Sequence, residues 1–350
     1  MTTRQRSQAV AAALAQLPGW PETSADDLLA PVTAELGHPE ILDSFQQLGT
    51  ARSHATPVSP LLHILTAAAP ASGVRSLARG LVLGTKNLVS SPQTPLLTAF
   101  LSALPDRLRS RVDHQTELPP QWLRSASGII AFGSDNELSA IRNDLRTDRP
   151  IELHPPSVSF AIVFGDSDLS SPPLAAHDIA SSMALGESLV HDIFLAHSAA
   201  TPTRYARRLA AALDLLSPSS PPPPPAAVSD LRSSYTFRAA TDPTVSVHGQ
   251  QSPAGHTVIA ESDPLFATAP APSVVFVKPL PDTLANSLRF VLPCIDTIAV
   301  HPFDNTTVAT ALEAGAARVC PLGKIASPPQ HSHPDRLPQF SPWVRWIDLG

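Results

Sequence analysis

The chain has 350 residues, of which 43% are hydrophobic and 15% are charged. This length favours two domains, and the apolar content is typical of a globular protein with a substantial core. The formal net charge of −6 and the lack of a long basic run argue against nucleic acid or an anionic membrane as the main partner. Two cysteines cannot form a disulfide framework, and no apolar run reaches the roughly 18 residues of a membrane span. We therefore expect a cytoplasmic protein without a transmembrane segment.

Residues 1–50 predict an N-terminal helical segment, with short helices broken at Pro18, Pro21, Pro31 and Pro39. The alanine-rich stretch before Pro18 has some features of a signal peptide. Glutamines lie just before it and inside it, so an ordinary amphipathic helix is the better interpretation. We expect this segment to be folded and to precede the first domain.

Strands and helices alternate after residue 57, which predicts an α/β fold with a doubly wound parallel sheet. Short apolar runs predict the strands, at 61–65, 87–89, 128–133, 151–153, 157–164, 192–196, 274–277 and 297–300. Helical spacing of apolar residues predicts the helices, at 72–83, 95–104, 136–145, 178–185 and 202–216. Gly84 is expected to close the first of these helices, and Ser134 with Glu137 to form a capping box at the third.

A proline-rich segment of low complexity occupies residues 217–227, with five consecutive prolines at 221–225. Proline has no backbone N–H, so this run cannot lie inside a sheet and predicts an extended, exposed spacer. A docking site for a partner protein is the alternative interpretation.

Five segments carry family motifs, and the first spans residues 63–89 with HILTAAAP and GLVLGTKNLV. Three shorter ones follow, with AFGSD at 131–135, SFAIV at 159–163, and DIA at 178–180 leading to Gly186. The last and most specific contains GAARVCPLGK at 315–324 and WVRWID at 343–348. In this order and spacing, the chain from about residue 55 onward resembles the fatty acyl-CoA reductases of bacterial luminescence and their relatives. These enzymes form a branch of the aldehyde dehydrogenase superfamily.

The resemblance implies two Rossmann-like lobes with a cleft between them. The nucleotide-binding lobe would span residues 51–175, and the catalytic-type lobe residues 176–350 with the proline-rich segment as an insertion. The resemblance also implies the reaction. A cysteine thiolate attacks the acyl-CoA thioester, and a hydride from NADPH reduces the acyl-enzyme to an aldehyde. An asparagine side chain and a backbone N–H hold the developing oxyanion.

Positions that carry this chemistry in the family hold other residues in this chain. The family nucleophile directly follows a glycine, which is Gly186 here, so its position is Glu187. The oxyanion asparagine stands two residues before a proline, here Pro70, and its position is Ala68. Removing one such donor costs on the order of 3 kcal/mol of transition-state stabilisation. Relatives also place a lysine that meets the cofactor ribose near the point where this chain has Ser90 and Ser91.

Three hypotheses follow from these departures. The first is an active acyl-CoA reductase with an unusual nucleophile, although Cys294 and Cys320 are best interpreted as small buried hydrophobic residues. The second is an impaired or non-catalytic homologue that binds acyl-CoA or a protein partner. The third is acyl transfer through Glu187 as a mixed anhydride, which no other feature of the sequence supports.

The strand–glycine–helix pattern at Gly133, Ser134 and Asp135 is the best candidate for cofactor binding. Free N–H groups at the start of a helix can face a phosphate, and the family uses the corresponding loop for its cofactor, NADPH. No metal site is expected, because His331 and His333 with Cys320 match no standard ligand spacing.

Overall fold

The protein is described by a computed structural model that covers residues 1–143, 149–165, 169–196, 201–216, 226–250, 255–281, 284–329, 332–333 and 336–350. It forms two compact units. The first contains Met1–Pro156 and Pro329–Gly350, and the second contains Ser157–Pro328. Among the described residues no helix is long and apolar enough to cross a membrane.

The boundary between the units lies at Ser157, whereas the sequence placed it near residue 175. Strand β8 (Val158–Val163) is the reason, because it pairs with β9 (Asp192–Leu195) and β13 (Ile295–His301) in the sheet of the second unit. The chain also returns to the first unit at its end, where β15 (Val344–Leu349) pairs with β2 (Ala51–Pro57).

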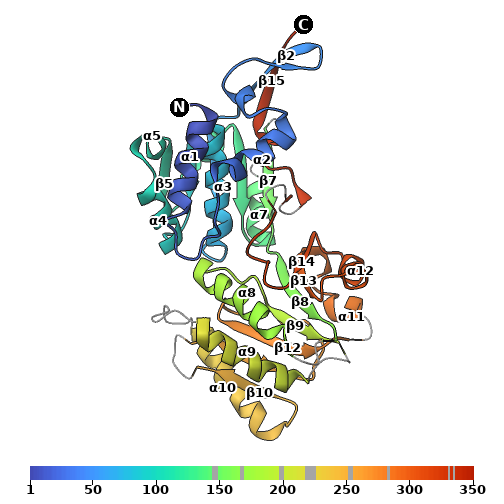
Figure 1. Ribbon diagram of the computed structural model, residues 1–350. Helices are drawn as coiled ribbons and strands as arrows, with labels where there is room; N and C mark the ends of the chain where they lie inside the picture. Colours follow the sequence, from blue (N-terminus) through green and yellow to red (C-terminus); the bar gives the residue numbers. More distant parts are fainter. Residues whose placement is uncertain are drawn as a thin grey trace. The chain divides into compact units, whose positions relative to one another are not determined.

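The first unit holds a five-stranded parallel sheet in the order β5-β4-β3-β6-β7. Its strands are β3 (Leu61–Ile64), β4 (Asn87–Ser90), β5 (Val112–Gln115), β6 (Gly128–Phe132) and β7 (Ile151–His154). Its helices are α1 (Thr3–Leu14), α2 (Ala25–Leu36), α3 (Pro70–Leu83), α4 (Pro95–Ala103), α5 (Asp106–Arg109), α6 (Pro120–Ser125) and α7 (Asp135–Asn143), with 3-10 helices at Pro39–Leu42 and Ser341–Trp343. Helices α1, α3 and α4 pack against one another (Figure 1).

Sheet order defines where the first unit can bind a ligand. The chain leaves β3 for β4 and β5 on one side, then continues at β6 and β7 on the other side of β3. The direction of winding therefore reverses between β3 and β6. In open α/β sheets, ligands bind at such a switch point, outside the carboxyl ends of the strands.

Gly80 allows α3 to lie against a buried polar network under its centre. A Cβ atom at this position would lie 2.0 Å from the Asn87 side-chain oxygen, so a larger residue would displace Asn87 from the network. His63 connects its neighbours, with Nδ1 2.8 Å from Ser76 Oγ and Nε2 3.0 Å from Asn87 Oδ1. Burial lowers the pKa of His63 to about 4. The helix ends at Gly84 in the left-handed conformation, as predicted.

The N-terminal helical segment belongs to the first unit and differs from expectation at one proline. Pro31 lies inside α2 and does not end it. Proline cannot donate to the carbonyl four residues earlier, which weakens a helix. Here the ring is buried, and a capping box between Ser24 and Asp27 stabilises the helix start.

The C-terminal segment is fixed to the first unit by polar and apolar contacts. The Glu35 carboxylate on α2 accepts N–H bonds of 2.7–2.8 Å from three consecutive residues, Gln339, Phe340 and Ser341. Trp343 follows and is buried. Strand β15 then completes an antiparallel three-stranded sheet with β1 (Gln46–Leu48) and β2.

The second unit holds a seven-stranded sheet in the order β10-β11-β12-β9-β8-β13-β14, parallel except for the β10–β11 pair. Its further strands are β10 (Ser246–Gly249), β11 (Thr257–Ala260), β12 (Val274–Pro279) and β14 (Arg318–Pro321). Its helices are α8 (Pro172–Leu185), α9 (Pro202–Leu216), α10 (Ala226–Thr241), α11 (Leu284–Leu288) and α12 (Asn305–Glu313), with a 3-10 helix at Leu292–Cys294. Helices α8 and α9 cover one face (Figure 1). Side chains of α10, α11 and α12 pack on the other face.

Helix α10 corrects the prediction for the proline-rich segment. Residues 217–225 lie outside the described residues, but Ala226 and Ala227 begin α10 and are not extended. Both are exposed, as expected, and alanine is the strongest helix former. Helix α10 was not among the predicted helices, although Val228, Leu231 and Tyr235 stand at helical spacing and pack on one hydrophobic cluster.

Asp178 connects two of the family motifs inside the second unit. Its buried carboxylate accepts N–H bonds from Gly323 at 2.7 Å and from Ile325 at 3.0 Å. It thereby ties α8 to the loop after β14. Burial raises the pKa of Asp178 to about 6, and the two N–H bonds oppose this rise. The folded state therefore binds a proton more readily than the unfolded chain, so the contribution of this group to stability falls as pH rises from about 4 through 6.

Replacing Asp178 by asparagine is expected to lower the free energy of unfolding by about 1–3 kcal/mol. The amide N–H₂ of asparagine would face a backbone N–H that a carboxylate oxygen of Asp178 accepts in the natural protein, and this N–H would lose its acceptor. Urea unfolding followed by circular dichroism measures this loss. Asp26→Asn is the matched control, since the Asp26 side chain is 82% exposed. Equal stability of the two variants would contradict the anchoring role of Asp178.

Candidate functional site

Two loops meet at the carboxyl edge of the sheet in the first unit, on the two sides of the switch point. Strands β3 and β6 are neighbours, with Ile64 opposite Ala131. The loop from β3 to α3 contains Ala68, which is exposed in a turn, and its N–H donates to Thr66 Oγ1 at 3.3 Å. The loop from β6 to α7 contains Gly133 and Ser134. The structure therefore brings the predicted oxyanion position and the predicted cofactor loop to the same edge of one sheet.

The start of α7 forms the predicted capping box, and its carboxylate also faces the predicted phosphate position. Glu137 Oε2 accepts from Ser134 N at 2.8 Å and from Ser134 Oγ at 2.7 Å. These two bonds lower the pKa of Glu137. Asp135 is the first residue of the helix. An anion of the protein itself thus occupies the donors that a bound phosphate would use.

A buried chain of charged side chains, which the sequence did not reveal, supports the end of β6. Phe132 stacks on His154 with ring centroids 4.3 Å apart and planes 9° apart. His154 Nε2 lies 2.6 Å from Glu152 Oε1, and both Arg79 Nη atoms lie 3.2 Å from the same oxygen. Burial acts to raise the pKa of Glu152, but the His154 bond and the Arg79 charge outweigh it, so the pKa is lowered. The network fixes Phe132, the residue before Gly133.

Glu187 lies in the second unit, in the turn between α8 and β9. Gly186 ends α8 in the left-handed conformation, with φ of 68°. The Glu187 N–H then donates to Ser182 O at 3.1 Å, and the residue is half-buried. From its position after Gly186, Glu187 is predicted at the start of a helix or in the turn leading into a strand, and the structure has it in the turn. Its position at the base of a cleft between the lobes stays a prediction.

Residues just after this turn bind a single loop of the second unit. His191 Nδ1 accepts from Ala269 N at 3.0 Å, and Asp192 Oδ2 accepts from Ala267 N at 3.1 Å. Burial lowers the pKa of His191 to about 4. Both side chains thus hold a loop in place, and this gives them a structural role beside the predicted nucleophile position.

Asp192 also belongs to a buried ionic cluster around Lys278. The Lys278 ammonium lies 3.4 Å from Asp192 Oδ1 and 3.2 Å from Glu261 Oε1, and it donates to Leu265 O. All three charged side chains are at most 5% exposed. Burial raises the pKa of Asp192 to about 7, although Lys278 opposes this. On the far side, Arg238 of α10 lies 3.3 Å from Glu261 Oε2.

The structure offers neither cysteine as an obvious replacement nucleophile. Cys320 lies in β14, and burial raises the pKa of its thiol to about 12, so the thiolate is disfavoured at neutral pH. Cys294 is half-buried at the end of a 3-10 helix. No group of three or more His, Cys, Asp or Glu side chains within the described ranges could hold a metal ion. His331, considered as a ligand from the sequence, lies outside those ranges.

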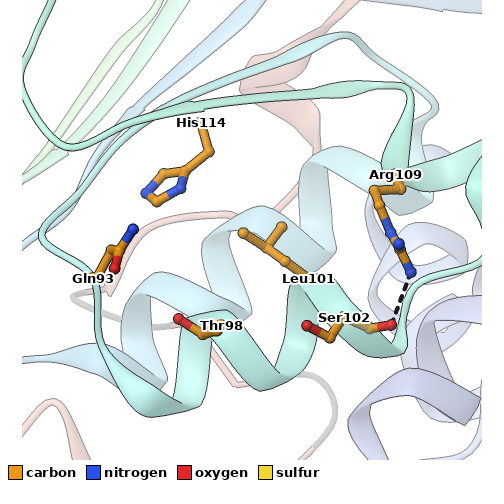
Figure 2. A pocket seen from close by; sticks show the side chains of 6 residues that line it. All are labelled: Gln93, Thr98, Leu101, Ser102, Arg109 and His114. Atoms are coloured by element: carbon orange, nitrogen blue, oxygen red, sulfur yellow. Dashed lines mark hydrogen bonds between the residues drawn. The ribbon is translucent and has the colours of Figure 1, made fainter.

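A pocket of about 240 Å³ lies beside α4 in the first unit (Figure 2). It is lined by Gln93, Thr98, Leu101, Ser102, Arg109 and His114. These residues come from the loop after β4, from α4, from α5 and from β5. No motif indicated this pocket, because Arg109 is one of many arginines and the loop, helices and strand that line the pocket converge only in the folded chain.

The family model for acyl-CoA reductase (LuxC) matches residues 3–335. The chain belongs to the acyl-CoA reductase family. This confirms the resemblance, and it extends the family region to the N-terminal helices, which the sequence motifs did not reach. No curated protein sequence matches this acyl-CoA reductase family member.

Solved structures show that the acyl-CoA reductase family member has the aldehyde dehydrogenase fold. It is similar to gamma-glutamyl-gamma-aminobutyraldehyde dehydrogenase from Burkholderia cenocepacia, with a TM-score of 0.64, 14% identity, and coverage of 100% of this chain and 84% of that one. It is also similar to indole-3-acetaldehyde dehydrogenase from P. syringae in complex with NAD+, with a TM-score of 0.61, 14% identity, and coverage of 100% of this chain and 84% of that one. Betaine aldehyde dehydrogenase from Staphylococcus aureus is similar with a TM-score of 0.63, 13% identity, and coverage of 100% of this chain and 83% of that one. The predicted α/β fold with Rossmann-like lobes is thereby confirmed.

Proposed function

We propose that this member of the acyl-CoA reductase family binds acyl-CoA and NADPH but has lost the ability to reduce the thioester. The observation that carries the proposal is that Glu187 directly follows the helix-ending Gly186, where the resemblance to the family implies a cysteine nucleophile. A carboxylate is a much weaker nucleophile than a thiolate, and its attack on a thioester gives a reactive anhydride in place of a stable acyl-enzyme.

Two further observations support the loss of reduction. Ala68 has only a methyl side chain, so it offers no donor for an oxyanion at the asparagine position. The burial that raises the thiol pKa of Cys320 leaves that side chain unreactive.

The edge of the sheet in the first unit supports dinucleotide binding. The switch point between β3 and β6 is where a dinucleotide lies in folds of this class. Ser134 N and Oγ would hold a phosphate there, and the buried His154 would keep Phe132 and its loop in position. When bound, NADPH supplies the hydride of the family reaction. The residues fit the group on one condition, which is that the Glu137 carboxylate turns away from Ser134.

Two measurements on the full chain test the proposal. Calorimetry with NADPH and with a long-chain acyl-CoA is expected to show binding of both. NADPH consumption in the presence of the acyl-CoA is expected to stay at background. Turnover by the natural protein would overturn the loss of reduction. Absence of heat and of any thermal shift with either ligand would overturn the binding proposal and favour a protein-binding role.

Neutralising Glu137 is expected to strengthen dinucleotide binding by about two- to fivefold, because a carboxylate no longer competes for the positive end of α7. The variant is Glu137→Gln, which keeps the hydrogen-bonding shape of the capping box. Titration of NADPH against the variant and the natural protein measures the change. Glu313→Gln, at the end of α12, changes the net charge equally and is the control. An unchanged or weaker affinity in Glu137→Gln would show that this helix start does not hold a phosphate.

A further inference from the structure

We infer that two parts of the second unit form one edge module that opens from the sheet while the rest of that unit stays folded. The first part is α10. The second is the strap, defined as residues 262–273, which connects β11 to β12. The two parts meet at the buried Lys278 cluster, and the inference does not depend on a bound ligand.

The strap is held by side chains of the sheet, because it has no regular structure of its own. Residues 262–273 are all described and contain no helix or strand. Backbone groups of residues 265, 267 and 269 each bond to one side chain. These side chains belong to Lys278 of β12, Asp192 of β9 and His191, which precedes β9. The strap therefore depends on a few polar contacts.

The Lys278 cluster holds α10 as well. The ammonium lies 3.2 Å from Glu261 Oε1, and Arg238 of α10 lies 3.3 Å from Glu261 Oε2. Tyr235, almost one turn earlier on α10, donates to the same carboxylate at 3.3 Å. Glu261 thus links α10 to the ammonium that holds the strap. Neither part can leave the sheet without disturbing the ionic contacts of the other.

Apolar side chains of the two parts also share one cluster over β11 and β12. It contains Val228, Leu231 and Tyr235 of α10 with Ala267, Ala269 and Ala271 of the strap. The rest of this face carries another cluster, under α11 and α12, and Phe266 is the only residue of the strap that packs on it. The opposite face, under α8 and α9, has a cluster of its own. Both of these clusters can stay covered when the edge module leaves.

The charges of the cluster make this boundary easier to open than an apolar one. Lys278, Asp192 and Glu261 are buried. Removing ions from water costs about as much free energy as their attraction returns, so a buried ion pair adds little net stability. Opening hydrates all three side chains again. A segment held by such contacts is expected to open before the apolar core does.

Opening would also loosen the turn that contains Glu187. His191 and Asp192 follow this turn and lose their strap partners in the open state. The closed edge module is therefore a condition for a fixed geometry at the predicted nucleophile position.

Hydrogen exchange of the full chain in low concentrations of urea, followed by mass spectrometry, tests the inference. We expect the amides of α10 and the bonded amides of the strap, at Ala267 and Ala269, to share one free energy of opening. This value is expected to lie below that of β8 and β13. Different values for α10 and the strap, or one value for the whole second unit, would overturn the inference.

Variants inside the edge module test the link between its parts. Arg238→Gln cuts a contact of α10, and His191→Phe removes an acceptor of the strap. Each is expected to accelerate exchange in both parts at least threefold and by the same factor, because both parts open in one step. Acceleration confined to the part that loses the contact would show that α10 and the strap open separately.

Asp178→Asn is the matched variant outside the edge module. Asp178 ties α8 to the loop after β14, and opening of the module does not break those bonds. The variant is expected to accelerate exchange in β8 and β13, which requires unfolding of the whole unit, and to leave α10 and the strap unchanged. Equal acceleration of α10, the strap and the central strands would show that the second unit opens only as a whole.

Discussion

Reduction of long-chain acyl-CoA is expected to be undetectable with the natural protein and to be restored best by the double variant Glu187→Cys with Ala68→Asn. The first change supplies a thiolate and the second supplies a side-chain donor for the oxyanion. The cysteine alone leaves the oxyanion less well held, and the asparagine alone has no nucleophile to assist. Groups that act as one catalytic unit are non-additive, so the double variant is expected to exceed the sum of the single variants.

Two readouts separate the steps of this experiment. Labelled acyl-CoA trapped on the protein reports acyl-enzyme formation, and NADPH consumption reports reduction. Robust turnover by the unaltered protein would overturn the proposed loss of activity, and Cys294→Ser would then be the first variant to locate the nucleophile. Failure of the double variant despite measured NADPH binding would show that the nucleophile position is not Glu187 or that further site residues are missing.

Removing the charge of Lys278 is expected to destabilise the second unit by about 3–5 kcal/mol, the loss typical when one partner of a buried ion pair is deleted. In Lys278→Met, the Asp192 carboxylate loses its charged neighbour, while Glu261 keeps Arg238. Urea unfolding at pH 8 measures the loss. Lys86→Met is the control, because Lys86 pairs with Asp113 at the surface and such pairs contribute at most about 1 kcal/mol.

The pH dependence of this variant tests the physical cause. Burial raises the pKa of Asp192 to about 7, above its value in the unfolded chain, so the folded state binds the proton more tightly. Stability from this group is therefore present at low pH and is lost as pH rises toward 7. Without Lys278 the pKa rises further, so the destabilisation is expected to be smaller at pH 5 than at pH 8. A loss that does not depend on pH would point to altered packing in place of the unpaired charge.

Local signals in the sequence predicted local structure well. The glycine at position 84 and the Ser134–Glu137 pair sit within one helix turn of the feature they specify, and both features are present. Gly186 likewise ends α8, so Glu187 lies in the turn after it, which is one of the two places predicted for this residue. Two weaker signals were misjudged. Pro31 was expected to break a helix but lies inside α2 with its ring buried. The short apolar stripe of Val228, Leu231 and Tyr235 in α10 was overlooked beside the proline-rich segment.

Features built from distant segments were beyond the sequence. Asp192 and Lys278 stand on β9 and β12, and Glu261 directly follows β11; these three strands are neighbours only because of the sheet order. The sequence also did not indicate that Glu137 competes with a phosphate for the donors of Ser134. A capping box predicts the start of a helix, whether or not that helix start binds an anion.

The course of the chain sets an order on how this protein can fold during synthesis. Residues 329–350 leave the ribosome after all of the second unit, yet they supply Trp343 and β15 to the first unit. Until then the Glu35 carboxylate has none of its three N–H partners from residues 339–341, and β2 lacks a neighbour on one edge. The second unit is continuous in sequence and can assemble first. A nascent chain therefore holds an unfinished N-terminal half for most of translation, and a stalled ribosome near the end would release a protein whose second unit is intact and whose first unit is open.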